Sequence, residues 1–212
     1  KKVLITAGPT REKIDPVRYI SNKSSGKMGF SLAKAAVDES AIVTLISGPV
    51  TLDTPERVKR IDIESAEEMK EHVTANLSDV DLFISTAAVA DFKMKNTQAQ
   101  KIKKDQSKNM SLSLEKNEDI LKLVSDNNPD LKIVGFAAET ENMIDNARKK
   151  LSSKNLNLIV ANDVSDTSIG FDSNNNEVTL ITEKEELKIP KTSKEKVARK
   201  IVQFISKNIL ND

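Results

Sequence analysis

The 212-residue sequence contains no cysteine, no tryptophan, one histidine and one tyrosine. Without cysteine, the chain can form neither disulfides nor thiolate metal sites, and it has no cysteine nucleophile. Lysine and arginine number 33 against 32 aspartates and glutamates. The chain therefore lacks the basic excess of a general nucleic-acid binder, and any cationic site must be local. No apolar run approaches the roughly 20 residues that a membrane-spanning helix needs. We expect a soluble, cytoplasmic protein with neither a membrane nor a nucleic acid as partner.

Short β-branched apolar runs alternate with helical patterns along most of the chain. These runs are apolar on both faces, as parallel strands are when helices cover both sides of their sheet. Repeated β-α units of this kind indicate a doubly wound sheet. The sequence predicts an α/β, modified Rossmann-like fold with a mostly parallel central sheet, reaching to about Ala161. The predicted strands are Val3–Thr6, Ile42–Ser47, Leu82–Thr86, Ile133–Phe136 and Leu158–Ala161.

Helix starts and the C-terminal segment have their own signals. Ser65–Glu68 reads as a capping box at the start of a helix. After the parallel core, Val178–Ile181 and Leu187–Ile189 predict a β-hairpin. A last helix is predicted to start at Thr192, whose hydroxyl would form a capping box with Glu195. The length of 212 residues suits a single domain over residues 1–212.

Ser21–Phe30 forms the first strand-to-helix crossing, where free backbone N–H groups and the positive end of a helix dipole favour a phosphate. The segment does not match a P-loop, because Ser21 replaces the first glycine and Met28 replaces the Mg²⁺-binding Ser/Thr. Gly26 and Gly29 give only G-x-x-G, which fails the dinucleotide fingerprint. An anion site and a simple helix start fit the segment equally well.

The predicted strand at Leu82 ends in a run of small residues and then reaches an aspartate. Small side chains at the carboxyl end of a parallel strand let a ligand approach the backbone, and open α/β sheets bind ligands at that edge. Asp91, at the mouth, could accept hydrogen bonds from ribose hydroxyls or a base, or bind the water shell of a metal. The plainer alternative is an aspartate that starts a loop. The small residues are Ser85, Thr86, Ala87 and Ala88.

A polar segment from about residue 92 to 112 has no clear period and contains six lysines. A loop that long inside a compact domain is usually functional. A solvated surface, or an RNA-binding or nuclear-localisation patch, would explain the charge. Phe92 is the only aromatic residue nearby, which is poor support for the stacking of bases. A flexible cationic strap over a triphosphate explains length, charge and position together. Its lysines are Lys93, Lys95, Lys101, Lys103, Lys104 and Lys108.

Three further features invite a functional interpretation beside an ordinary one. Asn117–Ile120 opens a predicted helix. Phe136 could stack on a base, although a core phenylalanine is more common. Lys150 and Lys154 lie one helical turn apart and could share a phosphate, although a solvated face is more usual. The lone histidine, His72, is assigned no role.

Together these features resemble the bacterial phosphopantothenoylcysteine synthetases, also called phosphopantothenate–cysteine ligases. The matching segments occur in the family's order over nearly the whole chain. They are Gly8–Glu12, Asp15–Asn22, Ser24–Gly29, Ala87–Asp91, Lys101–Lys104, Gly135–Thr140 and Ala161–Val164.

The resemblance implies a homodimer that joins 4′-phosphopantothenate to L-cysteine with CTP and Mg²⁺, in coenzyme A biosynthesis. The carboxylate first attacks the α-phosphate of CTP, giving an acyl-cytidylate and pyrophosphate. The cysteine amine then displaces CMP. Transfer at the α-phosphate needs positive charge along the triphosphate rather than a covalent nucleophile. In the second step, the side-chain amide of Asn22 could stabilise the oxyanion that forms at the acyl carbon.

The resemblance also implies roles for residues that match the family's motifs. Asn22, Arg18 and Lys101 would be catalytic. Phosphopantothenate would contact Arg18, Asn22 and Ala88, with Arg18 able to reach across the dimer. CTP would contact Ser85, Thr86, Ala87, Asp91, Lys101, Glu118, Asp119, Ile120, Leu121, Phe136, Lys150 and Lys154. Glu118 departs from the family, which often has proline there. The sequence identifies no metal ligands.

Many bacterial relatives carry an N-terminal flavin-dependent decarboxylase domain, and the expectation here is the stand-alone form. Two other functions are alternatives. An NAD(P)-dependent oxidoreductase would use the same fold, but the dinucleotide fingerprint is missing. A non-enzymatic nucleotide- or RNA-binding module would use the lysine strap, but the net charge of +1 and the 3% aromatic content weigh against it.

Overall fold

A computed structural model describes residues 1–103, 110–139, 142–163 and 173–210. Its centre is an eight-stranded sheet in which six strands run parallel and the last two, β11 and β12, are antiparallel. The first and last strands of the chain, β1 and β12, belong to this one sheet. In spatial order the strands are β12 (Glu186–Ser193), β11 (Asn175–Ile181), β10 (Leu158–Asp163), β9 (Lys132–Glu139), β6 (Leu82–Ser85), β1 (Lys2–Ala7), β4 (Ile42–Ser47) and β5 (Val58–Asp62).

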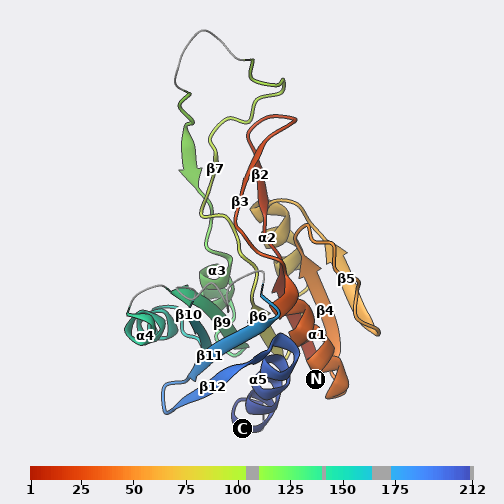
Figure 1. Cartoon of the computed structure of the whole chain (residues 1–212), viewed down its shortest axis with the longest axis vertical. Helices are drawn as coiled ribbons and strands as arrows, with labels where there is room; N and C mark the ends of the chain where they lie inside the picture. Colours follow the sequence, from red (N-terminus) through yellow and green to blue (C-terminus); the bar gives the residue numbers. More distant parts are fainter. Residues whose placement is uncertain (104–109, 140–141, 164–172, 211–212) are drawn as a thin grey trace.

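Helices cover both faces of the sheet and bury its apolar side chains (Figure 1). On one face, α1 (Lys27–Asp38) and α5 (Lys194–Asn208) pack over a cluster that includes Ile5 and Leu45. On the other face lie α2 (Ala66–Ala75), α3 (Ile120–Asn127) and α4 (Met143–Ser153), over a cluster that includes Phe83. The predicted fold, a mostly parallel sheet with helices on both faces, is confirmed.

The chain reverses direction across the sheet at β1. From β1 it continues to β4 and β5 on one side, and then returns through α2 to β6 on the other side of β1. The connections after β1 and β6 therefore diverge at the carboxyl edge of the sheet. In open α/β sheets this switch point is where a crevice forms and ligands bind.

An arm rises from the same carboxyl edge, away from the body of the molecule (Figure 1). It consists of two short antiparallel pairs, β2 (Arg11–Lys13) with β3 (Tyr19–Ser21), and β7 (Phe92–Met94) with β8 (Leu114–Lys116). The two pairs are joined where the Gln98 amide donates to the Ile14 carbonyl oxygen at 3.0 Å.

The structure extends or corrects several local predictions. Edge strand β5 was not predicted, because Val58–Asp62 contains three charged residues in five and lacks an apolar run. The predicted strap begins with strand β7 and is followed by strand β8, and both strands are too short to show a period. Lys104 and Lys108 lie outside the described residues. The C-terminal hairpin is confirmed as β11 and β12.

Two capping boxes were predicted at helix starts, and the structure confirms one of them and moves the other. Ser65 caps α2 by accepting from the Glu68 amide at 3.2 Å, as predicted. The predicted cap of the last helix at Thr192 is wrong by one residue. Ser193, the last residue of β12, caps α5, and its Oγ atom accepts from the Lys196 amide at 3.3 Å.

Gly29 lets α1 press against the ends of β1 and β6. A Cβ atom there would lie 2.5 Å from Ala7 Cβ and 2.6 Å from Thr86 Oγ1. Glycine-to-alanine changes inside helices normally stabilise by about 0.5–1 kcal/mol, but this one must push the helix outward. We expect Gly29→Ala to lower the free energy of unfolding by about 1–3 kcal/mol, measured by urea denaturation.

The control is Lys34→Ala, an exposed position on the same helix where lysine and alanine have similar helix propensities. A Gly29→Ala variant as stable as the unchanged chain would contradict the close packing.

Candidate active site

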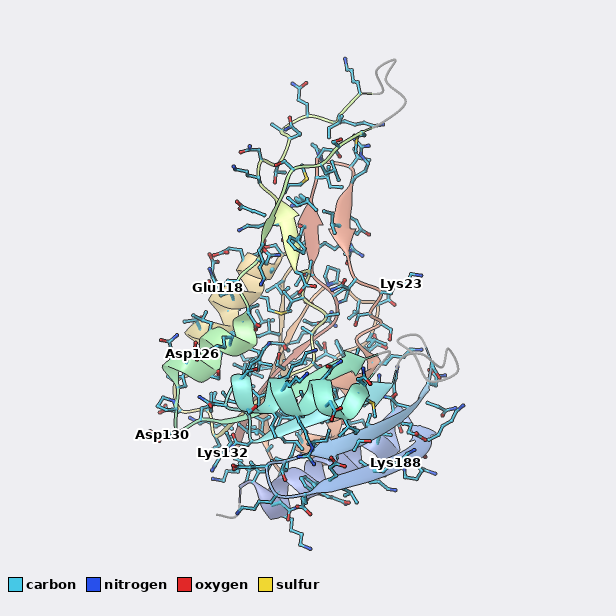
Figure 2. The ribbon with its side chains drawn as sticks, turned by 90° about the vertical axis from the view of Figure 1, so that its left-hand side faces the viewer. Lys23, Glu118, Asp126, Asp130, Lys132 and Lys188 are labelled. Atoms are coloured by element: carbon cyan, nitrogen blue, oxygen red, sulfur yellow. The ribbon has the colours of Figure 1, made fainter. Side chains whose placement is uncertain are left out.

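A cavity of about 610 Å³ opens at the switch point, a volume typical of small-molecule sites. Its walls come from the loop after β6, the start of α1, the start of α3 and the end of β9. Lys23 and Glu118, which both line it, lie on opposite sides of the base of the arm (Figure 2). Segments distant in sequence thus meet at the edge where the sequence predicted a ligand.

The loop after β6 is fixed to the loop after β1 by a ladder of hydrogen bonds. Thr86 Oγ1 donates to the Thr6 carbonyl oxygen at 2.6 Å, and the Ala88 amide donates to the Gly8 carbonyl oxygen at 2.9 Å. The Ala90 amide donates to Thr10 Oγ1 at 2.9 Å. These hydrogen bonds hold the loop against its neighbour, and its small side chains leave room for a ligand close to the backbone.

Asn22 bridges β3 to this loop. Its Nδ2 atom donates to the carbonyl oxygens of Ala88 and Val89, at 3.3 and 3.0 Å. The Nδ2 group thus already has two acceptors, and the side chain lies directly against the wall where Ala88 lines the cavity. To act as an oxyanion donor, Asn22 must exchange one of these hydrogen bonds for one to the substrate.

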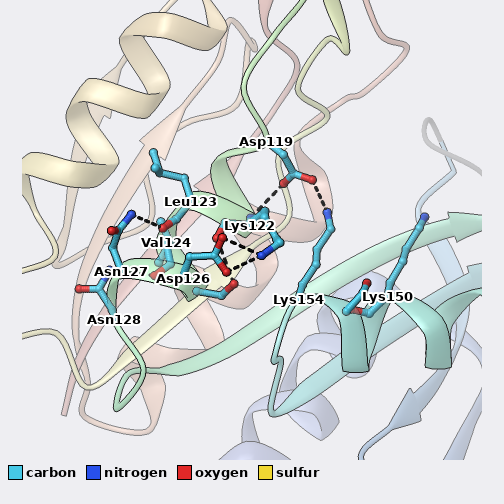
Figure 3. Close-up of polar contacts among 11 residues, drawn as sticks. Asp119, Lys122, Leu123, Val124, Asp126, Asn127, Asn128, Lys150 and Lys154 are labelled. Atoms are coloured by element: carbon cyan, nitrogen blue, oxygen red, sulfur yellow. Dashed lines mark hydrogen bonds and ion pairs between the residues drawn. The ribbon is translucent and has the colours of Figure 1, made fainter.

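The start of α3 carries a charged pair at the cavity wall (Figure 3). Asp119 caps the helix by accepting from the Lys122 amide at 3.0 Å, and its other oxygen accepts from Lys154 Nζ at 2.6 Å. Lys150 extends from α4 in the same direction as Lys154 (Figure 3). Glu118, next to the cap, pairs with Lys70 of α2 at 3.3 Å. The predicted helix start at Asn117–Ile120 is confirmed.

Most residues that the sequence assigned to the site come together in the cavity wall, and three do not. Lys150 lies beside the wall on α4, while Arg18 and Lys101 lie in the arm. Their roles as contacts stay predictions. The assigned residues that line the cavity are Asn22, Ser85, Thr86, Ala87, Ala88, Asp91, Glu118, Asp119, Ile120, Leu121, Phe136 and Lys154.

Two cavity residues without an assigned role emerge from the structure. Asn162, at the end of β10, lines the cavity, and its Oδ1 atom is buried with no hydrogen-bond partner in the described part of the chain. Lys194, only 6% exposed, stands with Lys27 between this cavity and a second one of about 810 Å³. Asn162 falls in a segment that matched the family, but no local pattern marked its side chain. No pattern in the sequence indicated that Lys194 would lie at the cavity.

The described residues contain no group of three or more histidines and carboxylates that could hold a metal ion by themselves. A nucleotide-bound Mg²⁺ needs less, because phosphate oxygens and water fill most of its coordination positions. Of the cavity carboxylates, Asp119 and Glu118 already pair with lysines. Exposed Asp91 is the carboxylate best placed to meet such an ion. No helix in the described part of the chain is both long and apolar enough to cross a membrane.

Comparison with known proteins shows the family of this chain. Residues 1–209 match the family described as DNA/pantothenate metabolism flavoprotein C-terminal domain. The chain belongs to this family. It is 50% identical over 209 residues to the coenzyme A biosynthesis bifunctional protein CoaBC of Vibrio vulnificus, covering 97% of this chain and 52% of that protein. The CoaBC protein of Escherichia coli is 46% identical over 208 residues, with 96% and 51% covered.

Two solved structures share this fold over nearly the whole chain. The crystal structure of the C-terminal domain of a CoaBC protein is 41% identical and superposes with a TM-score of 0.84, covering 100% of this chain and 97% of that one. A Cab2 mutant in complex with phosphopantothenate-cysteine superposes with a TM-score of 0.77 over 96% of this chain and 85% of that one. At 18% identity, the Cab2 comparison supports the fold alone.

The chain spans about half the length of the curated relatives it matches. The expectation of a stand-alone form therefore stays a prediction. The family relationship rests on 46–50% identity over nearly all of this chain, including the segments that form the cavity.

The Asp119–Lys154 pair makes stability depend on pH. Burial alone would raise the pKa of Asp119, but the hydrogen bonds from Lys154 and from the Lys122 amide lower it more, below its ordinary value of 3.8. Asp119 therefore binds a proton less tightly in the folded state than in the unfolded state. This stabilisation is present above the unfolded pKa and is lost as the pH falls through the folded pKa.

We expect Asp119→Asn, which keeps an N-cap acceptor but loses the charge, to be less stable than the unchanged chain at pH 7. The difference should shrink at pH 3, measured by urea unfolding at both pH values. Asp130→Asn, in the turn after α3, is the control. A difference that stays constant from pH 7 to pH 3 would show that the charge of Asp119 contributes nothing.

Proposed function

We propose that the chain is a CTP-dependent phosphopantothenate–cysteine ligase of coenzyme A biosynthesis. The observation that carries the proposal is the cavity at the switch point, built from the same segments that match this family. The carboxylate of 4′-phosphopantothenate attacks the α-phosphorus of CTP, and pyrophosphate leaves. The amine of L-cysteine then attacks the acyl carbon of the acyl-cytidylate, and CMP leaves as the amide forms.

The nucleotide lies along the wall formed by β6, β9 and α3. Backbone groups of Ser85, Thr86 and Ala87 approach it closely because their side chains are small. Phe136, half-buried at the cavity wall, offers a ring for stacking on the base. The pair of Asp119 and Lys154 presents an acceptor and a donor, which the amino group and ring atoms of a base require. Asp91, Glu118, Ile120, Leu121 and Lys150 complete this side.

The reacting acyl group lies at Asn22 and Ala88. Displacing CMP passes through a tetrahedral centre whose oxygen becomes negative, and a positioned amide donor stabilises such an oxygen. Asn22 reaches that role by exchanging one of its hydrogen bonds to the loop carbonyls. The side chain of Ala88 is small, so the acyl chain can lie against the backbone at this point of the cavity wall.

Mg²⁺, bound with the nucleotide, would offset negative charge on the triphosphate, with Asp91 as the nearest suitable carboxylate. The remaining positive charge comes from lysine and arginine side chains. Lys154 lies in the cavity wall, whereas Arg18 and Lys101 are carried by the arm.

The arm supports the proposal of a homodimer. Five large apolar side chains on it are 43 to 61% exposed, and a gathering of such side chains on one structure marks an interaction surface. They are Val17, Tyr19, Phe92, Met110 and Leu114. A second copy of the chain that packs against the arm would bury them, and would bring the arm of one subunit to the body of the other.

Pyrophosphate release tests the reaction. We expect the purified chain to release pyrophosphate from CTP and Mg²⁺ only when 4′-phosphopantothenate is present, and CMP only when L-cysteine is added as well. The measurement is a coupled pyrophosphate assay with each component omitted in turn and with ATP in place of CTP. Release without phosphopantothenate, or a cofactor-dependent change in NAD(P)H absorbance instead, would refute the proposal.

Asn22 should matter more for the second step than for the first. Asn22→Asp removes the donor hydrogens and places a carboxylate near the acyl oxygen, so we expect acyl-cytidylate to form and accumulate while its conversion slows by roughly 10²–10³-fold. Rapid-quench analysis of both steps measures this. The control Asn127→Asp makes the same chemical change on the exposed face of α3. Equal slowing of both steps would remove Asn22 from the second step.

A further inference from the structure

A buried aspartate lies at the root of the turn that carries Arg18. Asp15 follows β2, is 2% exposed, and its carboxylate is entirely removed from solvent. It receives hydrogen bonds on both oxygens, from the adjacent turn and from Ile102, which is 87 residues away in sequence. A buried carboxylate with this many donors is held by its surroundings and holds them in return.

The two oxygens of Asp15 do different things. Oδ1 accepts from the amides of Val17 and Arg18, each at 2.9 Å, and so shapes the turn between β2 and β3. Oδ2 accepts from the Arg18 guanidinium, at 3.1 Å from Nε and 2.5 Å from Nη2, and from the Ile102 amide at 3.1 Å. Only the first oxygen is needed for the turn.

Arg18 closes this arrangement. Its Nη2 atom also donates to the Ile102 carbonyl oxygen at 3.2 Å, so Asp15, Arg18 and Ile102 contact one another in a triangle. The Arg18 guanidinium holds the pKa of the Asp15 carboxyl well below its usual range, which keeps the hydrogen bonds charge-assisted. Because Lys101 is bonded directly to Ile102, these hydrogen bonds also restrain the backbone of Lys101 relative to Arg18.

We propose that Asp15 is a positioning residue that joins Arg18 and Lys101 into one unit, so that both side chains always serve the same active site. This inference rests on the proposed function. Neither side chain lines the cavity of its own subunit, and the arm points away from the body (Figure 1). The cavity that receives the pair therefore belongs to a second copy of the chain.

Asp15→Asn separates positioning from folding. Asparagine keeps one acceptor for the turn amides but directs its NH₂ group at the Arg18 and Ile102 donors. We expect the rate of acyl-cytidylate formation to fall by roughly 10²-fold, with little change in melting temperature. Lys13→Gln, an exposed position on β2 of the same arm, should leave the rate unchanged. Adding Lys101→Gln to Asp15→Asn should cost little more than Lys101→Gln alone, because residues of one unit are not additive. Fully additive losses would contradict the coupling.

Mixed dimers test the shared active site without altering Asp15. Differently tagged Asn22→Asp and Arg18→Ala chains are co-expressed, and the mixed dimer is purified and assayed for complete turnover. One of its two cavities then has an intact Asn22 and receives an intact arm. We expect about half of the normal activity, and the same for Asn22→Asp paired with Lys101→Gln. Homodimers of each variant give the baselines.

The decisive pair is Arg18→Ala with Lys101→Gln. If one arm delivers both side chains, every cavity in this mixed dimer receives one defective residue, and activity stays at the baseline. Recovery to about half would mean that the two side chains serve different cavities, and would overturn the inference. An unchanged chain that never releases pyrophosphate in response to phosphopantothenate would instead refute the proposed function.

Discussion

The site depends on the reversal of the chain around β1. Parallel strands send all their carboxyl ends to one edge, and the order β6-β1-β4 separates the connections after β1 and β6 there. Hydrogen bonds from the loop after β6 to Thr6 and Gly8 then fix the two diverging segments at the crevice. Gly29 brings α1 close enough to form the adjoining wall. The strand order creates the cavity, and the side chains that line it determine which groups of a ligand it can contact.

Charged groups around the cavity serve orientation more than stability. Lys154 with Asp119 and Lys70 with Glu118 are partly exposed pairs, which typically contribute little to the free energy of unfolding. Their value lies in holding acceptors and donors at set positions on the wall. Asp119 does this twice, because it also fixes the first turn of α3 through the Lys122 amide. A ligand that engages Asp119 or Lys154 therefore meets a group that is already oriented.

The sequence was informative where burial or small side chains left a pattern. Five apolar runs located five of the eight strands of the main sheet, and the hairpin runs located the last two. Val58–Asp62 escaped because an edge strand exposes its side chains, and its charged residues hide the period. Asn22, Ser85–Ala88 and Asp119 could be placed in the site by motif. The contact between Arg18 and Ile102 could not, because it joins residues 84 positions apart through two short hairpins without a periodic signal.

The arm explains why a buried charge occurs far from the hydrophobic core. Strands of three residues cannot fix a side chain by packing alone, since such short antiparallel pairs are at best marginally stable. A carboxylate with five donors supplies the order that packing cannot. Its cost of desolvation is offset by the adjacent guanidinium. The body of the molecule thus forms a cavity by topology, while in the arm one ion pair orders the turn that carries Arg18 and the backbone next to Lys101. If Arg18 and Lys101 act as proposed, the site is complete only where an arm meets the cavity of a second copy of the chain.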